Sequence, residues 1–167
     1  MLCYLDRGVE AAKILEQAAS DRFEHIAPDA ATLTALALYA EAAVLTDSSG
    51  PASILYEVIE PWADQIVCNG LNSYGHTRMW LGLLAACMGD HEQADQHLAF
   101  ACDFQETNGL RLWAARAHLG WAEALAGRGD AARAREHAAR ALELSREHGY
   151  GAFEEPAAAL VGAQSTA

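Results

Sequence analysis

The stretch "GRGDAARAREHAARALELSREHG" at residues 127–149 repeats the skeleton of "CMGDHEQADQHLAFACDFQETNG" at residues 87–109, displaced by 40 positions. Both copies contain Gly-Asp near their start and end on a glycine. The identical pairs are Gly89/Gly129, Asp90/Asp130, Ala94/Ala134, His97/His137, Ala99/Ala139, Ala101/Ala141 and Gly109/Gly149. Neither copy contains an obvious nucleophile or metal cluster. The repeat therefore predicts a helix that is copied because neighbouring units bury one another.

Every long segment of the chain has helical periodicity, and strict two-residue alternation is scarce, so a sheet is not expected. Pro61 should kink or interrupt the helix that contains it. Asp90, with Gln93 three residues later, forms a capping-box pattern, and Asn108-Gly109 predicts a left-handed stop. Ser73 is predicted to cap the helix that Gly89 ends. The other expected helices cover residues 8–25, 29–46, 51–68, 111–127, 130–148 and 155–163.

Helices of similar length at a fixed spacing are typical of an α-solenoid, and a tetratricopeptide-like hairpin needs small residues where its two helices cross. The first-helix crossing positions are Ala40, Gly82 and Ala122, and the second-helix positions are Ala52, Ala94 and Ala134. We therefore predict an all-α fold, an α-solenoid of antiparallel helix hairpins with a period of about 40 residues. It forms one helical-repeat domain, 1–167, divided into a half repeat (1–28), repeat 1 (29–70), repeat 2 (71–110), repeat 3 (111–151) and a C-terminal cap and tail (152–167).

The period places Ala12 at a second-helix position, so the chain opens on half a repeat. The residues before it, Met1 to Asp6, are too few for a partner helix. This predicts either an irregular N-terminal stub or a fragment of a longer repeat protein, and we expect the fragment. An exposed half repeat also allows a homodimer in which residues 1–25 pair with a second copy.

The net charge of −12 argues against direct nucleic-acid binding and against anionic membranes, because phosphate recognition needs a cationic surface. The apolar runs are short and the start lacks a signal-peptide pattern, so we expect a cytoplasmic protein. The four cysteines, Cys3, Cys68, Cys87 and Cys102, are expected to be reduced and mostly buried. Residues 111–146 hold 7 arginines and 4 acids, which indicates either a basic face for an acidic partner or a solvated helix with a Glu136–Arg140 pair.

No motif for a phosphate cradle, a nucleophile elbow or a zinc helix is present, so no catalytic residue, cofactor or metal is predicted. Glu41 and Glu123 occupy equivalent first-helix positions and could act as an acid and a base. Because the repeat copies them, groove lining is the simpler interpretation. A small all-helical enzyme or metal protein that uses Glu41, His76 and Glu123 remains an alternative.

The concave face of the first helices is the predicted binding site. Its apolar floor and polar anchors suit an extended or helical peptide, a protein partner or a small effector. The candidate residues are Thr34, Glu41, His76, Met79, Leu83, Arg116, Leu119 and Glu123.

Residues 106–151 carry the pattern G-x-x-x-W-x-A-R, a helix, G-D-x-x-x-A, and a helix that ends near Gly-Tyr. The matching residues are Gly109, Trp113, Ala115, Arg116, Gly129, Asp130, Ala134 and Gly149-Tyr150. This pattern resembles the C-terminal helical region of LuxR-type large ATP-binding regulators and the related nucleotidyl-cyclase/ATPase signalling proteins of actinobacterial type. The resemblance implies a sensor or scaffold arm, with the ATPase, cyclase and DNA-binding parts outside this chain.

The leading hypothesis is therefore a non-enzymatic helical-repeat module that binds a protein, a peptide or an effector, as part of a transcriptional or signalling regulator. The small helical enzyme or metal protein is the first alternative. A self-associating structural module is the second.

Overall fold

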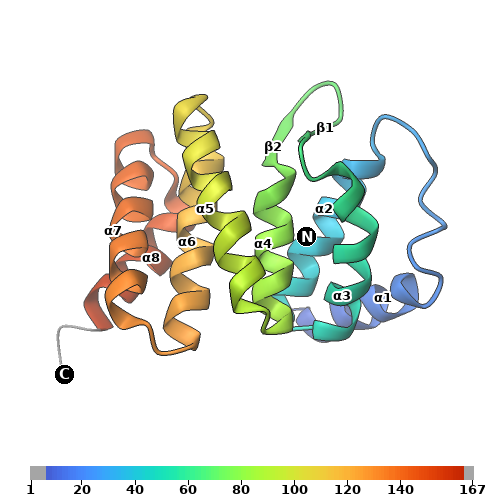
Figure 1. The fold of residues 1–167 in the computed structure, drawn as a ribbon, viewed down its shortest axis with the longest axis horizontal. Helices are drawn as coiled ribbons and strands as arrows, with labels where there is room; N and C mark the ends of the chain where they lie inside the picture. The colour runs from blue at the N-terminus through green and yellow to red at the C-terminus, as the bar shows by residue number, and fades with distance from the viewer. Residues whose placement is uncertain (1–6, 164–167) are drawn as a thin grey trace. The chain divides into compact units, whose positions relative to one another are not determined.

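The computed structural model describes residues 7–163, and these residues form a mostly helical fold with one small sheet (Figure 1). The all-α class predicted from the sequence is thus confirmed at this coarse level. Contacts divide the chain into two compact units, residues 1–94 and 95–167. The boundary lies within one helix. The helices are α1 (Gly8–Ser20), α2 (Thr32–Leu45), α3 (Ser49–Ile59), α4 (Thr77–Met88), α5 (His91–Thr107), α6 (Arg111–Gly127), α7 (Ala131–His148) and α8 (Gly151–Ala163).

The signals that delimit the repeated helices act as predicted. The carboxylate of Asp90 accepts a hydrogen bond from the Gln93 N–H at 3.1 Å, at the start of α5. Asp130 caps α7 in the same way, through the Arg133 N–H at 3.3 Å. Gly109 has φ 72° and Gly149 has φ 74°, so both glycines end their helices in the left-handed conformation.

The sequence prediction is wrong between α3 and α4, where the chain forms an antiparallel pair of strands, β1 (Ile66–Cys68) and β2 (Ser73–His76). Ser73 therefore lies in a strand. His76 caps α4 instead, because its Nδ1 accepts a hydrogen bond from the Arg78 N–H. The Asn69 side chain accepts from the N–H groups of Leu71 and Asn72, which closes the turn.

In the first unit α1, α2 and α3 each bury one face, whereas α4 is buried on all sides from Met79 to Ala85. Pro61 interrupts the chain as expected, because α3 ends at Ile59 and a short 3-10 turn, Glu60–Trp62, follows. Helix α2 packs against both α3 and α4. The crossing residues Ala40 and Ala52 are fully buried, which lets the backbones approach closely.

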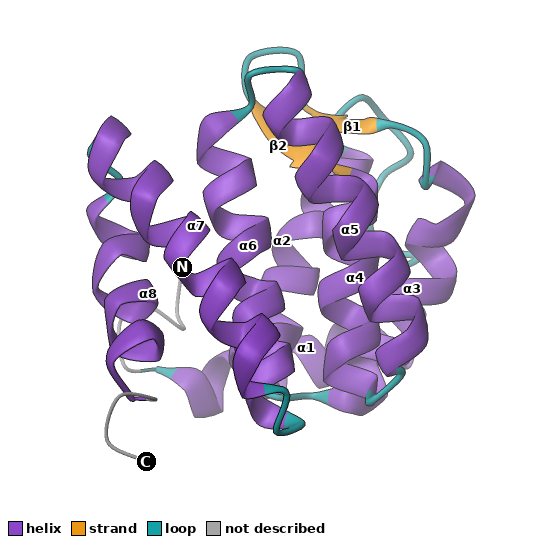
Figure 2. Ribbon diagram, turned by 60° about the vertical axis from the view of Figure 1, so that its left-hand side comes forward, coloured by secondary structure: helices purple, strands orange, loops and turns teal. Residues whose placement is uncertain are grey.

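In the second unit α6 packs against α7 and α8, and α7 packs against α8 (Figure 2). The crossing residues Ala122 and Ala134 are buried. Helix α8 begins four residues before its predicted start and adds Ala157 to a cluster with Leu119 and Ala141. It is thus an integral part of the core of this unit.

Two expectations fall on residues that the structure does not describe. The N-terminal stub with Cys3 and the polar tail at 164–167 both lie outside the described range. Within residues 7–163, no helix combines the length and the apolar character that a membrane span requires.

Candidate functional site

Most of the side chains that were predicted to line a groove in the first unit are buried. Thr34 on α2, Met79 and Leu83 on α4, and the capping residue His76 are all buried, whereas Glu41 is half-buried. Burial also lowers the pKa of His76. These residues share one unit, but only Glu41 presents appreciable side-chain surface to a ligand.

The remaining three predicted residues lie on α6 in the second unit. Arg116 and Leu119 are buried, and Leu119 contacts the core cluster that α7 and α8 complete. Glu123 is exposed. Helix α8 therefore covers part of the α6 face that was expected to be open, and groove binding through these positions stays a prediction.

The three residues of the enzyme alternative are divided between the two units. Glu41 and His76 belong to the first unit and Glu123 belongs to the second. Across residues 7–163, no group of three or more metal-ligating side chains is arranged to hold an ion. The described cysteines are free. Cys102 is buried and Cys87 half-buried, but Cys68 is exposed on β1, contrary to the expectation that these thiols are mostly buried.

An apolar stripe runs along the outer face of α2. Its members recur at alternating spacings of four and three residues, so they lie on one side of the helix. Leu38 is 54% exposed and Leu45 is 45% exposed. The stripe consists of Ala31, Ala35, Leu38, Ala42 and Leu45. Its members Ala35 and Ala42 each follow a predicted groove residue of this helix, Thr34, which is buried, and Glu41, which is half-buried.

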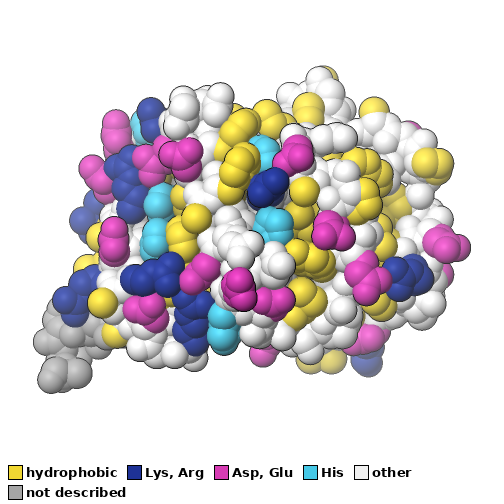
Figure 3. All heavy atoms as spheres, in the orientation of Figure 1, with side chains coloured by type: hydrophobic (Ala, Val, Ile, Leu, Met, Phe, Trp, Pro, Cys, Tyr) yellow, Lys and Arg dark blue, Asp and Glu magenta, His cyan; other side chains and the backbone are white. Residues whose placement is uncertain are grey.

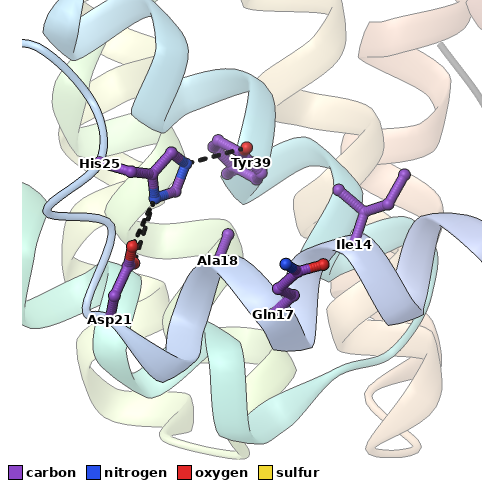
Figure 4. Close-up of a pocket in the computed structure, with 6 residues that line it drawn as sticks. All are labelled: Ile14, Gln17, Ala18, Asp21, His25 and Tyr39. Carbon is purple, nitrogen blue, oxygen red and sulfur yellow. Dashed lines mark hydrogen bonds and ion pairs between the residues drawn. The ribbon is translucent and has the colours of Figure 1, made fainter.

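A pocket of about 250 Å³ opens between α1 and α2. Figure 4 shows the six lining residues around it. Ile14, Gln17 and Ala18 come from α1, Asp21 and His25 come from the turn after it, and Tyr39 comes from α2. The volume is slightly below the ~300–1,000 Å³ of drug-sized ligand sites, so it suits a single side chain or a small molecule.

The polar lining residues of this pocket hold one another in place. His25 Nδ1 lies 3.0 Å from Asp21 Oδ2, and His25 Nε2 lies 3.4 Å from the Tyr39 hydroxyl. Asp21 Oδ1 also accepts a hydrogen bond from the Phe23 N–H at 3.0 Å. The Phe23 and Tyr39 rings pack with centroids 5.2 Å apart. The pocket therefore has a carboxylate and an aromatic ring in fixed positions.

The turn that carries Asp21 and His25 has an unusual backbone. Arg22 has φ 54° and Phe23 has φ 63°, and side-chain-bearing residues of this size rarely adopt such values. Phe23 is buried, and Arg22 forms an ion pair with Glu57 of α3 at 2.8 Å. These contacts offset the cost of the conformation, which is on the order of 1–3 kcal/mol per residue.

The second unit contains a different kind of cluster, a polar network centred on Glu106 of α5. Arg140 of α7 donates two hydrogen bonds to the Glu106 carboxylate, from Nε at 3.0 Å and from Nη2. His118 Nε2 of α6 lies 2.9 Å from the same carboxylate. These contacts, and those of Arg140 above all, lower the pKa of Glu106 to about 2. Arg140 also pairs with Glu143, and not with the expected Glu136.

Two histidines extend this network. His118 Nδ1 lies 2.9 Å from His137 Nδ1. Burial lowers the pKa of His118, and burial together with the neighbouring His118 lowers the pKa of His137 to about 4. Both rings are therefore neutral near pH 7. Because Glu106 needs a donor, His118 carries its proton on Nε2, and His137 then donates from Nδ1 to His118.

Trp121 joins this network to a second carboxylate, Asp95. The Trp121 ring stacks on His137 with centroids 4.0 Å apart, and its Nε1 donates to Asp95 at 2.7 Å. Arg128 and Arg133 also donate to Asp95. Burial raises the pKa of Asp95, but the hydrogen bonds from Arg128, Trp121 and Arg133 outweigh it and keep the pKa low.

Acidic, basic and histidine side chains lie next to one another over α7 (Figure 3). The two units also differ in charge. Residues 1–94 hold 13 acids and 4 bases, a net charge of −9, whereas residues 95–167 hold 10 acids and 7 bases, a net charge of −3. The arginines of the second unit thus balance most of its carboxylates, and the first unit remains strongly acidic.

Comparison with known proteins finds no matching family model, no matching curated relative and no matching solved structure. The resemblance of residues 106–151 to the large ATP-binding regulators consequently stays a prediction.

Proposed function

We propose that this chain is a non-enzymatic helical module that binds a protein or peptide partner, and that the partner is a basic amphipathic helix docked on α2. The exposed apolar stripe of α2 is the observation that carries the proposal. Contiguous apolar surface on a soluble protein can mark a site of interaction with another protein. A partner helix with apolar residues at the matching spacing would cover the stripe.

The negative charge of the first unit favours a basic partner. Asp29 precedes α2, Glu41 lies beside the middle of the stripe, and Asp47 follows the helix. With a net charge of −9 over residues 1–94, the surface attracts Lys and Arg and repels an acidic helix.

The architecture that we propose for the chain is tetratricopeptide-like. Its support is the burial of the small residues at the predicted crossings, Ala40 with Ala52 and Ala122 with Ala134, where α2 packs on α3 and α6 packs on α7. In such a module the helices act as a scaffold and the exposed faces act as binding surfaces. We place the module in the cytoplasm, as the sensor or scaffold arm of a larger regulator.

The binding proposal is tested with a synthetic amphipathic helix that has leucine on one face and lysine on the other. Fluorescence anisotropy should show saturable binding that weakens as ionic strength rises from about 0.05 to about 0.5 M. The double variant Leu38→Glu/Leu45→Glu should weaken binding at least about tenfold, because it places charge on the stripe. The same peptide with glutamate in place of lysine should not bind.

The matched control is Ile66→Glu/Leu71→Glu, which adds the same charge at two exposed apolar residues of the same unit. This variant should bind like the unaltered protein. Equal losses in both variants would show that the peptide responds only to overall charge, and the docking site on α2 would be wrong.

A further inference from the structure

The pocket between α1 and α2 has the chemistry of a cation site. We propose that it binds a guanidinium or alkyl-ammonium group, with Asp21 as the charged partner and Tyr39 as the aromatic wall. This site does not depend on the docking surface of α2, because its lining residues do not belong to the apolar stripe.

Hydrogen-bond acceptors dominate the polar part of the pocket. The Asp21 carboxylate has about four lone-pair sites, and the Phe23 N–H and His25 occupy only part of that capacity. With His25 donating from Nδ1 to Asp21, His25 Nε2 accepts from the Tyr39 hydroxyl, whose oxygen keeps its own lone pairs. The Gln17 side-chain amide, which can both donate and accept, also lines the pocket. A ligand group rich in N–H donors therefore fits better than an anion.

No lysine or arginine lines the pocket to compete for these acceptors. The nearest arginine in the sequence, Arg22, is directed to Glu57. The apolar residues Ile14 and Ala18 provide contact for an aliphatic stem, and the face of the Tyr39 ring attracts a cation. The volume of about 250 Å³ suits a side chain of this size.

The backbone supports the same interpretation. Two consecutive left-handed residues, Arg22 and Phe23, turn the chain so that the His25 ring lies between the Asp21 carboxylate and the Tyr39 hydroxyl at the pocket (Figure 4). Strained backbone of this kind is concentrated at ligand sites, where it fixes side chains in advance. Here it fixes the carboxylate and the imidazole at 3.0 Å.

The test is a titration followed by the ¹H–¹⁵N spectrum of the full chain. N-acetyl-arginine amide should cause saturable shifts in the amides of residues 14–25 and of Tyr39. The citrulline analogue, in which a neutral urea replaces the guanidinium, should cause none. This comparison needs no variant, so a folding defect cannot obscure it. Equal shifts with the citrulline analogue, or no saturable shift with the arginine probe, would overturn the proposal.

Two variants test the role of the Asp21 charge. Asp21→Asn keeps the shape and the acceptor for the Phe23 N–H, and it should weaken binding about three- to fivefold, the worth of a partly exposed charge pair. Glu24→Gln removes the same charge from a neighbouring exposed acid and should change nothing. An Asp21→Asn protein that binds as tightly as Glu24→Gln would contradict the assignment.

The source of the cation is distinguished by a third probe, a short peptide with one central arginine. Tighter binding of this peptide than of N-acetyl-arginine amide would assign the pocket to a peptide side chain. Equal affinity would assign it to a free organic cation. If the arginine probe causes no shifts in the pocket amides while the lysine-faced helix still binds α2, this inference is refuted and the proposed docking on α2 is not.

Discussion

The two units of this chain differ in how their polar and apolar side chains are arranged. In the second unit, carboxylates, arginines and histidines of α5, α6 and α7 satisfy one another in one connected network. In the first unit, α2 keeps an apolar stripe at the surface and a carboxylate lines a pocket. Helices of similar length thus serve internal cohesion in the second unit, whereas α2 of the first unit keeps apolar surface on which we propose that a partner docks.

The largest expected difference comes from the same substitution at two leucines. Leu125→Ala removes a fully buried side chain of the second unit and should lower the free energy of unfolding by about 2–5 kcal/mol. Leu38→Ala on the exposed stripe should change it by less than about 1 kcal/mol. Urea unfolding followed by circular dichroism measures both values. Similar losses at the two positions would show that the stripe is part of the core.

The next effect concerns the network itself. Glu106→Ala leaves Arg140 and His118 without their shared acceptor and should cost about 2 kcal/mol, because hydrogen bonds to charged groups are the strong ones. Glu143→Ala removes another acceptor of Arg140, but this carboxylate is 63% exposed, so about 0.5 kcal/mol or less is expected. A Glu106→Ala protein as stable as Glu143→Ala would mean that the network contributes little.

The network should also make stability depend on pH. Unfolded histidine takes up a proton near pH 6.5, whereas His137 in the folded chain does so near pH 4. The unfolded state therefore binds more protons in this window, and stability falls as the pH is lowered from about 6.5 to about 4. Allowing for the partial exposure of His137, we expect a loss of about 1–2 kcal/mol.

Chemical denaturation at a series of pH values measures this loss, and His137→Gln should flatten the slope in that range. A second loss follows between about pH 4.5 and 2, where Glu106 is protonated first in the unfolded chain. An unchanged slope in His137→Gln would assign the upper window to other groups.

The smallest effect should come from Trp121. Trp121→Phe keeps an aromatic ring beside His137 but removes the donor to Asp95, and we expect a cost of about 1 kcal/mol. Trp62→Phe, in the 3-10 turn of the first unit, serves as the control and should lie within about 0.5 kcal/mol of the unaltered protein. Equal costs would show that the Asp95 contact contributes no stability of its own.

The sequence predicts the helices well because their ends carry local signals. Asp90, Gly109 and Gly149 act within one turn of the chain, and such short-range chemistry can be seen in the sequence itself. The strands β1 and β2 were missed because they span only three and four residues. The Asn69-Gly70 pair between them was the available signal for a hairpin.

The site was predicted less well, for two physical reasons. A shift of one residue along a helix turns its face by about 100°, which is enough to move a position from the surface to the core. On α2 the predicted groove residue Thr34 is buried, whereas Leu38 is exposed. Network partners such as Glu106 and Arg140 lie 34 positions apart, so no local pattern reveals them. The repeat offered one clue, because opposite charges on successive second helices can meet.

No pattern in the sequence indicates the pocket between α1 and α2. Its geometry depends on left-handed conformations at Arg22 and Phe23, and neither residue type predicts them.

Hydrogen–deuterium exchange with and without the lysine-faced helix shows which helix carries the docking surface. If the partner docks on α2, saturating peptide slows amide exchange in α2, Thr32–Leu45, and leaves α7, Ala131–His148, unchanged. Slower exchange in α7 with no change in α2 would contradict it, because the docking surface would then lie on the unit whose charges already satisfy one another.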